Sequence, residues 1–266
     1  MSWWGKVLGG ALGAAMGGPL GALIGAGVGH IWDRGLSDTD AWAVQRQERI
    51  QAAFFSALFS VLGHLAKADG RVSEDEIRMA SLLMDELDLD DEQKAFARNL
   101  FREGKADDFD LDAVVDQFRA EAGRRATVLH FFMEQLMTLA LADGELHPSE
   151  QTVLLRVAER LGFSRGHFEA LLAMVVARRG YRYHHGEQVS MSCREDTLAA
   201  AYQVLGVSPD ASDEEVRKAY RRQISRHHPD KLIAKGVPEE AIRLANETTH
   251  KIREAYEQIR AARTRG

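Results

Sequence analysis

The chain of 266 residues contains almost no cysteine and lacks the common sequence signatures of enzymes. Cys193 is its only cysteine, which excludes an internal disulfide and a zinc module built from pairs of cysteines. There is no P-loop, no glycine fingerprint for dinucleotides and no nucleophile elbow, so we expect neither intrinsic enzymatic activity nor an organic cofactor. No segment alternates apolar and polar residues convincingly, and we therefore predict an all-α fold.

The composition argues against nucleic acid as a partner. The formal net charge is −6, and no platform of interleaved aromatic residues is present on which bases could stack. Hydrophobic residues make up 45% of the chain and charged residues 28%, which suits globular domains. The length indicates one to three such domains.

One long apolar run lies near the N-terminus, where residues 7–29 carry no charge. A helix of this length, at about 1.5 Å per residue, covers a bilayer core of about 30 Å. Tryptophans flank the run on both sides, as in the aromatic belts of membrane proteins. The sequence therefore predicts a short tail at residues 1–6 and a transmembrane helix at residues 7–31. A cleaved signal peptide and a glycine-rich soluble segment are the alternatives.

Glycines recur every fourth residue within this run. Rows of small residues let two membrane helices approach closely, so we expect a homodimer through the membrane helix. The candidate contact residues are Gly13, Gly17, Gly21 and Gly25.

Residues 42–179 follow a helical pattern and contain an internal repeat. Residues 66–76 match residues 140–150, and apolar helices precede and follow both copies. Each unit therefore reads as a helix, an Asp-Gly turn and a second helix. The motif resembles the TerB family of all-helical domains, which is linked to tellurite resistance and envelope stress, over roughly residues 50–178.

Carboxylates of the two repeat units have two interpretations. They stabilise turns and helix starts, as the pairing of Ser73 with Glu76 and the position of Pro148 indicate. Alternatively, the two facing turns hold a divalent cation, which prefers oxygen ligands. The candidate ligands are Asp69, Glu76, Asp143 and Glu150.

Residues 180–195 have the composition of a linker. For residues 196–266 we predict two antiparallel helices joined at an exposed turn. Ser212 and Glu215 form a capping box, so a helix should begin at Asp213, and Pro229 should end it. A second helix is indicated by apolar positions spaced alternately by three and four residues. These positions are Ile242, Ala245, Thr249, Ile252, Tyr256 and Ile259.

His228, Pro229 and Asp230 occupy the turn between these helices. The arrangement resembles a J domain, the module by which co-chaperones activate DnaK-type ATPases. The resemblance implies that this tripeptide is the activating motif and that the basic helix before it contacts DnaK. That helix carries Arg217, Lys218, Arg221, Arg222 and Arg226. From charge alone, a solvated face, a nucleic-acid-binding helix and a steering surface for an acidic partner all remain open.

The order of tail, membrane span, TerB-like domain, linker and J domain resembles the DjlA family of membrane-anchored bacterial co-chaperones. The resemblance implies recruitment of DnaK at the inner membrane and a role in envelope-stress or capsule signalling. Charges around the span give almost no orientation bias, so the need for DnaK places the C-terminal domains in the cytoplasm. The alternative is a TerB-type metal or stress sensor at the membrane whose J-like tail is only an interaction module.

Overall fold

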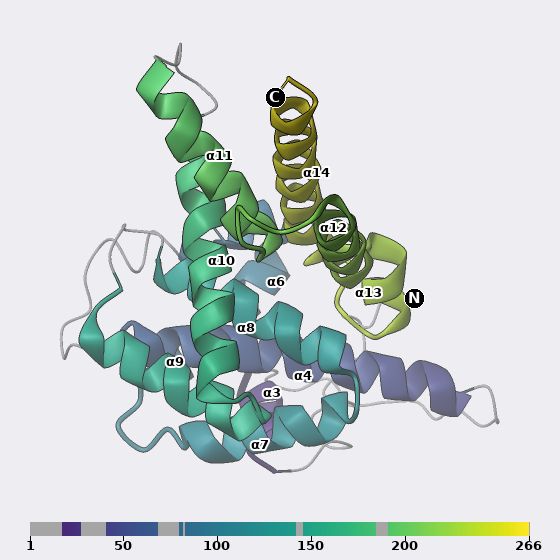
Figure 1. Cartoon of the computed structure of the whole chain (residues 1–266). Coiled ribbons are helices and arrows are strands. Elements are labelled where there is room, and N and C mark those ends of the chain that lie inside the picture. The colour runs from purple at the N-terminus through teal and green to yellow at the C-terminus, as the bar shows by residue number, and fades with distance from the viewer. Residues whose placement is uncertain are drawn as a thin grey trace.

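In the computed structural model, the described parts of the chain fold into helices joined by turns and loops (Figure 1). The described residues are 18–27, 41–68, 80–81, 83–141, 146–184 and 191–265. Their regular elements are all helices, which confirms the predicted all-α fold for this part of the chain.

The middle domain is built around the long helix α4. It packs against the three helices α6, α7 and α8, while α9 packs mainly on α7, and α10 packs on α8 and α9 (Figure 1). The bounds are α4 Ala41–Leu65, α6 Asp91–Gly104, α7 Leu111–Ala122, α8 Ala126–Ala140, α9 Pro148–Leu161 and α10 Arg165–His184.

Phenylalanine side chains form the centre of this domain. Phe54 of α4 lies 6.1 Å from Phe118 of α7, 6.0 Å from Phe131 and 5.6 Å from Phe132 of α8, measured between ring centroids. All four rings are buried, and each contributes about 1.5–3 kcal/mol to the free energy of unfolding. The three helices are therefore joined by one aromatic cluster.

The first helices of the two predicted repeat units are α4 and α8, and they pack against each other. In the second unit α9 begins at Pro148 in the first helical turn, as predicted. Glu150 accepts a hydrogen bond from the backbone N–H of His147 at 3.0 Å. The candidate residues Asp69, Glu76 and Asp143 lie outside the described residues.

Part of the predicted membrane span is the helix α3, Gly18–Gly27. Leu20 is fully buried in the same chain, and its backbone N–H donates to Oε1 of Gln117 in α7 at 2.8 Å. Gly21 is also buried. Among the described residues, none of the helices has the length and apolar character needed to cross a membrane. The rest of the predicted span, with Gly13 and Gly17, lies outside the described residues, so the span and its dimer contact stay predictions.

The C-terminal domain is a helical hairpin with two further helices packed beside it. Its helix α12 begins at Asp213 after the Ser212 cap and ends before Pro229, as the sequence predicts. The residues between the hairpin helices form a further short helix, α13, which the sequence analysis did not predict. The bounds are α11 Met191–Leu205, α12 Asp213–His227, α13 Pro229–Ala234 and α14 Ile242–Arg265.

Helices occupy most of the segment expected to be a linker. α10 continues to His184, α11 begins at Met191, and the two helices pack against each other (Figure 1). Gly180 lies within α10, where a glycine costs only about 1 kcal/mol relative to alanine. In the parts of residues 180–195 that the structure describes, the chain is therefore helical rather than extended.

The hairpin is docked on the middle domain instead of standing apart from it. Leu232, Val237 and Ile242 belong to the same buried apolar cluster as the phenylalanines of the middle domain. A Cβ atom on Gly236, whose φ is +93°, would lie 3.0 Å from Ile50 of α4. The chain around α13 therefore packs closely against α4.

Candidate functional site

The His228-Pro229-Asp230 tripeptide forms the junction between α12 and α13. His228 has φ −65° and ψ 123°, an extended conformation that a following proline favours. Pro229 then occupies the first position of α13, where its missing N–H costs no hydrogen bond. The sequence around the tripeptide thus ends one helix and begins the next within a single residue.

His228 caps the short helix with its own ring. Nδ1 accepts a hydrogen bond from the backbone N–H of Asp230 at 3.2 Å. A ring nitrogen that accepts carries no proton, so the ring proton lies on Nε2, which remains for a partner. The side chain of His228 is 45% exposed and that of Asp230 is 87% exposed. The turn therefore presents a hydrogen-bond donor and a carboxylate to solvent.

Four hydrogen bonds hold this turn in place. The carbonyl oxygen of His228 accepts from the N–H groups of Lys231 and Leu232 at 3.1 and 3.0 Å. Thr249 of α14 donates from its hydroxyl group to the carbonyl oxygen of His227 at 3.2 Å. Lys231 donates from Nζ to the hydroxyl group of Ser225 at 2.6 Å. The second hairpin helix thus braces the last turn of the first.

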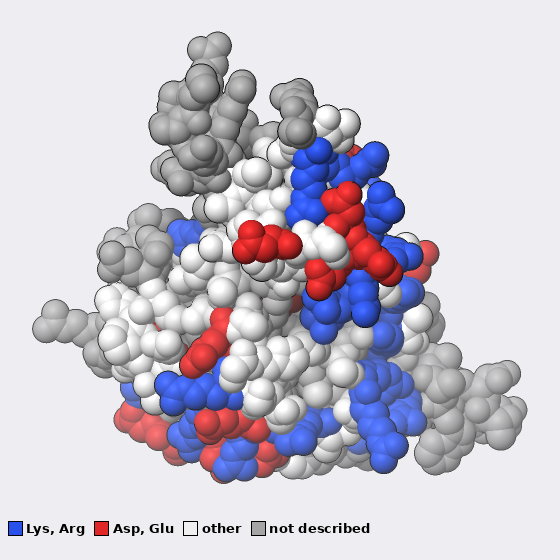
Figure 2. All heavy atoms as spheres, in the orientation of Figure 1, with Lys and Arg blue, Asp and Glu red and all other residues white. Residues whose placement is uncertain are grey.

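The basic helix divides its charges between two faces. Arg217, Lys218, Arg221 and Arg222 are exposed, and Figure 2 shows lysine and arginine side chains gathered over α12 and its neighbours. Arg226 differs, because it is half-buried where α12 meets the middle domain. Burial, and next the charge of Arg222, lower the pKa of the Arg226 guanidinium. Four of the five predicted contact cations are therefore free to meet a partner.

The hairpin is stiffened by aromatic and charged contacts away from the turn. Tyr220 of α12 stacks on Tyr256 of α14, with 4.1 Å between centroids and 12° between the ring planes. Arg263 donates to the hydroxyl group of Tyr202 at 2.9 Å, to Asp213 at 2.6 Å and to the carbonyl oxygen of Ala211 at 2.6 Å. The C-terminal end of α14 is thereby tied to α11 and to the start of α12.

A buried ionic cluster joins the two domains directly behind the turn. Glu134 of α8 lies 2.6 Å from Nε2 of His227 and 3.3 Å from the guanidinium group of Arg178 in α10. Side-chain exposure is 2% for Glu134, 3% for His227 and 9% for Arg178. Sequence analysis did not single out any of the three. A lone glutamate within the apolar helix α8 was the available signal, because a buried carboxylate requires a cationic partner.

Electrostatics of this cluster favour the ionised carboxylate. Burial alone raises the pKa of the Glu134 carboxyl, but the charges of Arg178 and His227 outweigh it and hold the pKa well below its usual range. Burial, and then the charge of Arg226, lower the pKa of the nearby His130 to about 4. The same two causes lower the pKa of His167. A single anion thus faces several cationic or potentially cationic groups.

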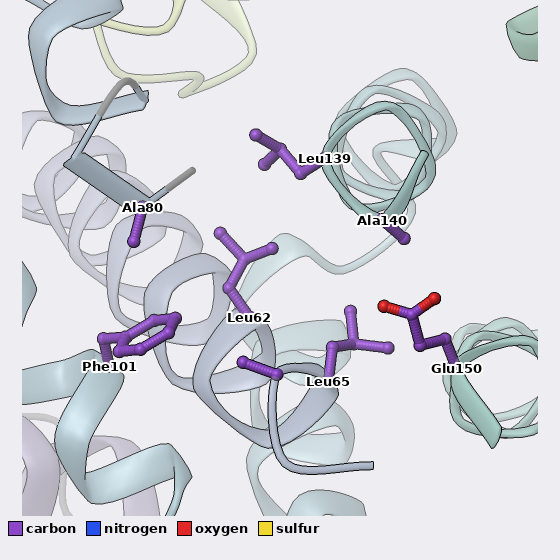
Figure 3. Close-up of a pocket in the computed structure, with 8 residues that line it drawn as sticks. Leu62, Leu65, Ala80, Phe101, Leu139, Ala140 and Glu150 are labelled. Carbon is purple, nitrogen blue, oxygen red and sulfur yellow. The ribbon is translucent and has the colours of Figure 1, made fainter. Parts of the chain in front are cut away.

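The described residues do not assemble a cation site around Glu150. No group of three histidine, cysteine, aspartate or glutamate residues with suitable geometry occurs within the described parts of the chain. Glu150 instead lies at the edge of an apolar pocket between the repeat units, lined by side chains such as Leu62, Leu65 and Phe101 (Figure 3). Metal binding therefore stays a prediction that depends on Asp69, Glu76 and Asp143.

Three family profiles match consecutive parts of the sequence. "Co-chaperone DjlA transmembrane domain" matches residues 1–39, "Tellurite resistance protein TerB" matches residues 55–173 and "DnaJ domain" matches residues 200–266. Curated proteins named co-chaperone protein DjlA match over nearly their whole length. The relative from Vibrio cholerae is 43% identical over 96% of both chains, and that from Escherichia coli K12 is 40% identical over 98% of both.

The chain belongs to the DjlA co-chaperone family. A relative from Photobacterium profundum, 41% identical over 97% of this chain and 98% of its own, carries the same name. None of the solved structures matches this chain. The DjlA family assignment confirms the order of a membrane domain, a TerB domain and a J domain that the sequence predicts. The J domain of this DjlA-family chain contains the turn described above.

Proposed function

We propose that this chain recruits a DnaK-type chaperone to the bacterial inner membrane and stimulates its ATPase through His228, Pro229 and Asp230. The observation that carries the proposal is the capped turn, which presents an exposed carboxylate and a ring N–H from a rigid junction. Membership of a family of co-chaperones supports it. A partner's conformational equilibrium can be shifted only by groups that bind its two states differently, and a fixed turn provides such groups.

The exposed cations of α12 supply the second part of the proposal. Arg217, Lys218, Arg221 and Arg222 form a positive surface next to the turn. Complementary charge raises the rate of association with an acidic partner and makes it dependent on ionic strength. The helix steers DnaK toward the turn, and the turn then acts on the ATPase cycle.

The membrane anchor follows from the family assignment rather than from the described helices. Residues 1–39 match the family's membrane domain. An N-terminal anchor with the TerB-like and J domains in the cytoplasm brings DnaK to clients at the inner membrane, in envelope-stress or capsule signalling. Self-association through Gly13, Gly17, Gly21 and Gly25 would place two J domains at one membrane site.

The decisive experiment measures steady-state ATP hydrolysis by DnaK with the full chain in detergent micelles. His228→Gln removes the ring while leaving most helix contacts, so we expect stimulation to disappear with the helical circular dichroism spectrum unchanged. Full stimulation by a folded His228→Gln variant would refute the proposal.

Charge reversal tests the steering surface separately. Arg221→Glu with Arg222→Glu should weaken DnaK association and flatten its dependence on salt, because about one favourable charge pair is lost for each substitution. Arg253→Glu, at an exposed arginine on α14, makes the same charge change as Arg221→Glu alone and is compared with that single variant. An equal effect at Arg253 would argue against α12 as the docking surface.

A further inference from the structure

We propose that Glu134 is a positioning residue for the His228-Pro229-Asp230 turn, which it holds against the TerB-like domain by binding the adjacent His227 as an imidazolium. The contact itself depends on no assumption about activity. Its consequence for DnaK rests on the proposed function above. Glu134 and His227 are 93 positions apart, so the inference requires the docked arrangement of the two domains.

The charge on His227 follows from its two hydrogen-bond partners. Nδ1 lies 2.9 Å from the backbone carbonyl oxygen of Gln223, and Nε2 lies 2.6 Å from Oε2 of Glu134. A carbonyl oxygen only accepts hydrogen bonds, and so does an ionised carboxylate. Both ring nitrogens must therefore donate, and a histidine that donates from both nitrogens carries a positive charge.

The carboxylate, in turn, is kept ionised by a second cation. Arg178 approaches Glu134 with both terminal nitrogens, at 3.3 Å from each oxygen. Such a two-point contact fixes the plane of the carboxylate and leaves Oε2 directed at His227. The alternative, a protonated Glu134 facing a neutral ring, would place an uncharged acid against a buried guanidinium group.

Three helices contribute the charged and titratable groups of this cluster. α8 contributes Glu134 and His130, α10 contributes Arg178 and His167, and α12 contributes His227 and Arg226. Glu134 is the one carboxylate among them, so its removal would leave Arg178, Arg226 and His227 facing one another without an anion. Breaking a buried ion pair from one side is strongly destabilising for this reason.

The cluster can set the position of the turn because it binds the residue immediately before it. His227 is held by its ring to α8 and by its carbonyl oxygen, through Thr249, to α14. On the same inner face, Gln223 donates to the sulfur of Met174 in α10 at 3.1 Å. The outer face of α12, with its four exposed cations, is thereby turned away from the TerB-like domain. The docked J domain presents its proposed DnaK-binding face to solvent.

The first experiment reads the charge state of His227 directly. Nitrogen-15 NMR of the full chain in detergent micelles, with labelled histidine, would identify His227 by the loss of its signals in His227→Gln. We expect both ring nitrogens to be protonated in the folded chain, as their two acceptors require. In Glu134→Gln the amide can donate to Nε2, so the ring should carry a single proton, on Nδ1. A neutral His227 ring in the wild-type chain would overturn the proposal.

The second experiment asks whether Glu134 holds the turn. Hydrogen exchange of Lys231 and Leu232, whose N–H groups donate to the carbonyl oxygen of His228, reports opening of the turn. We expect Glu134→Ala to accelerate this exchange by about a hundredfold, since it strands buried cations. Glu169→Ala, which removes an exposed carboxylate paired with Arg165, is the matched control and should change nothing here. Unchanged exchange in Glu134→Ala would overturn the positioning role.

The third readout separates positioning from chemistry in DnaK stimulation. Glu134→Ala leaves the tripeptide intact, so maximal stimulation should persist, while the half-saturating concentration should rise by at least about threefold because fewer molecules hold the competent orientation. Equal half-saturation in the variant and the wild type would contradict positioning. If the wild-type chain itself fails to stimulate DnaK, the proposed function is wrong, and the NMR and exchange results still decide the contact.

Discussion

Two glycines allow α4 and α6 to approach so closely that no larger residue fits between them. A Cβ atom on Gly63 would lie 2.0 Å from the carbonyl oxygen of Phe101, and one on Gly104 would lie 1.8 Å from that of Ser60. Both obstacles are backbone atoms, which cannot rotate aside as a side chain can. We predict that Gly63→Ala destabilises the middle domain although alanine is the better helix former.

The magnitude follows from the geometry. For the new methyl group to reach a separation of about 3 Å, α6 must retreat by about 1 Å along a buried interface. Overpacking of this kind lowers the free energy of unfolding by about 1–3 kcal/mol. Because the clashing atoms here belong to the backbone and cannot rotate aside, we expect a cost at the upper end of this range, about 3 kcal/mol. The gain in helix propensity offsets about 1 kcal/mol of this. The free energy of unfolding should therefore fall by about 2 kcal/mol, a large share of the about 5–15 kcal/mol typical of a domain.

The assay is urea denaturation of the full chain in detergent micelles, followed by far-ultraviolet circular dichroism. With a slope of about 1–3 kcal/mol per molar urea, the midpoint of the middle domain should fall by about 1 M. Gly166→Ala is the matched control, because no heavy atom lies within 4 Å of a Cβ placed there. It should raise stability by up to about 1 kcal/mol.

The refuting result is a midpoint for Gly63→Ala equal to or above that of the wild-type chain. The double variant Gly63→Ala with Gly104→Ala adds a further check. One outward shift of α6 relieves both clashes, so the combined loss should be smaller than the sum of the single losses. If the two losses were strictly additive, each clash would be relieved by a separate movement, which would contradict the close packing of α4 and α6 at both glycines.

Two further predictions concern other parts of the chain. Arg263→Met removes the charged hydrogen bonds to Tyr202, Asp213 and Ala211, and it should lower the free energy of unfolding of the J domain by about 1–2 kcal/mol. Hydrogen exchange of α11 and α14 at increasing denaturant concentration measures this loss, and Arg260→Met, at an exposed arginine, should cause none. His130 has a pKa lowered to about 4 in the folded chain, so the unfolded chain takes up this proton first as pH falls below about 6.5. Stability should therefore decline between about pH 6.5 and pH 4, and His130→Gln should flatten that decline in urea titrations while the exposed His250→Gln should not.

The sequence predicts the J-domain hairpin well because its helix ends are marked by local chemistry. Ser212 and Glu215 form the expected capping box, with both reciprocal hydrogen bonds present. Pro229 ends α12 because of the restriction it places on the preceding residue. The same proline also begins α13, and this missed helix could have been predicted from proline and aspartate in its first turn.

Tertiary contacts between distant segments could not be predicted in the same way. Nothing local in the sequence indicates that Leu232 and Val237 pack into the core of the TerB-like domain, or that α10 and α11 lie side by side. A polar stretch such as residues 180–195 is compatible with both an extended linker and an exposed helix. Contacts with distant parts of the chain determine which of the two conformations forms, and these contacts cannot be inferred from a single sequence.

The contact between the two domains is nevertheless visible in the sequence of α12, as polar residues at buried positions. Positions 216, 219, 223 and 227 form its buried stripe, yet the last two are glutamine and histidine rather than apolar residues. In the sequence they look like imperfections in an amphipathic helix. In the structure they are the residues that meet Met174 and Glu134 of the other domain. A polar residue on a buried stripe requires a buried partner, and when the helix's own domain lacks one, the partner belongs to another domain. The exposed cations lie on the opposite positions, so the helix periodicity assigns one face of α12 to the TerB-like domain and leaves the other for DnaK.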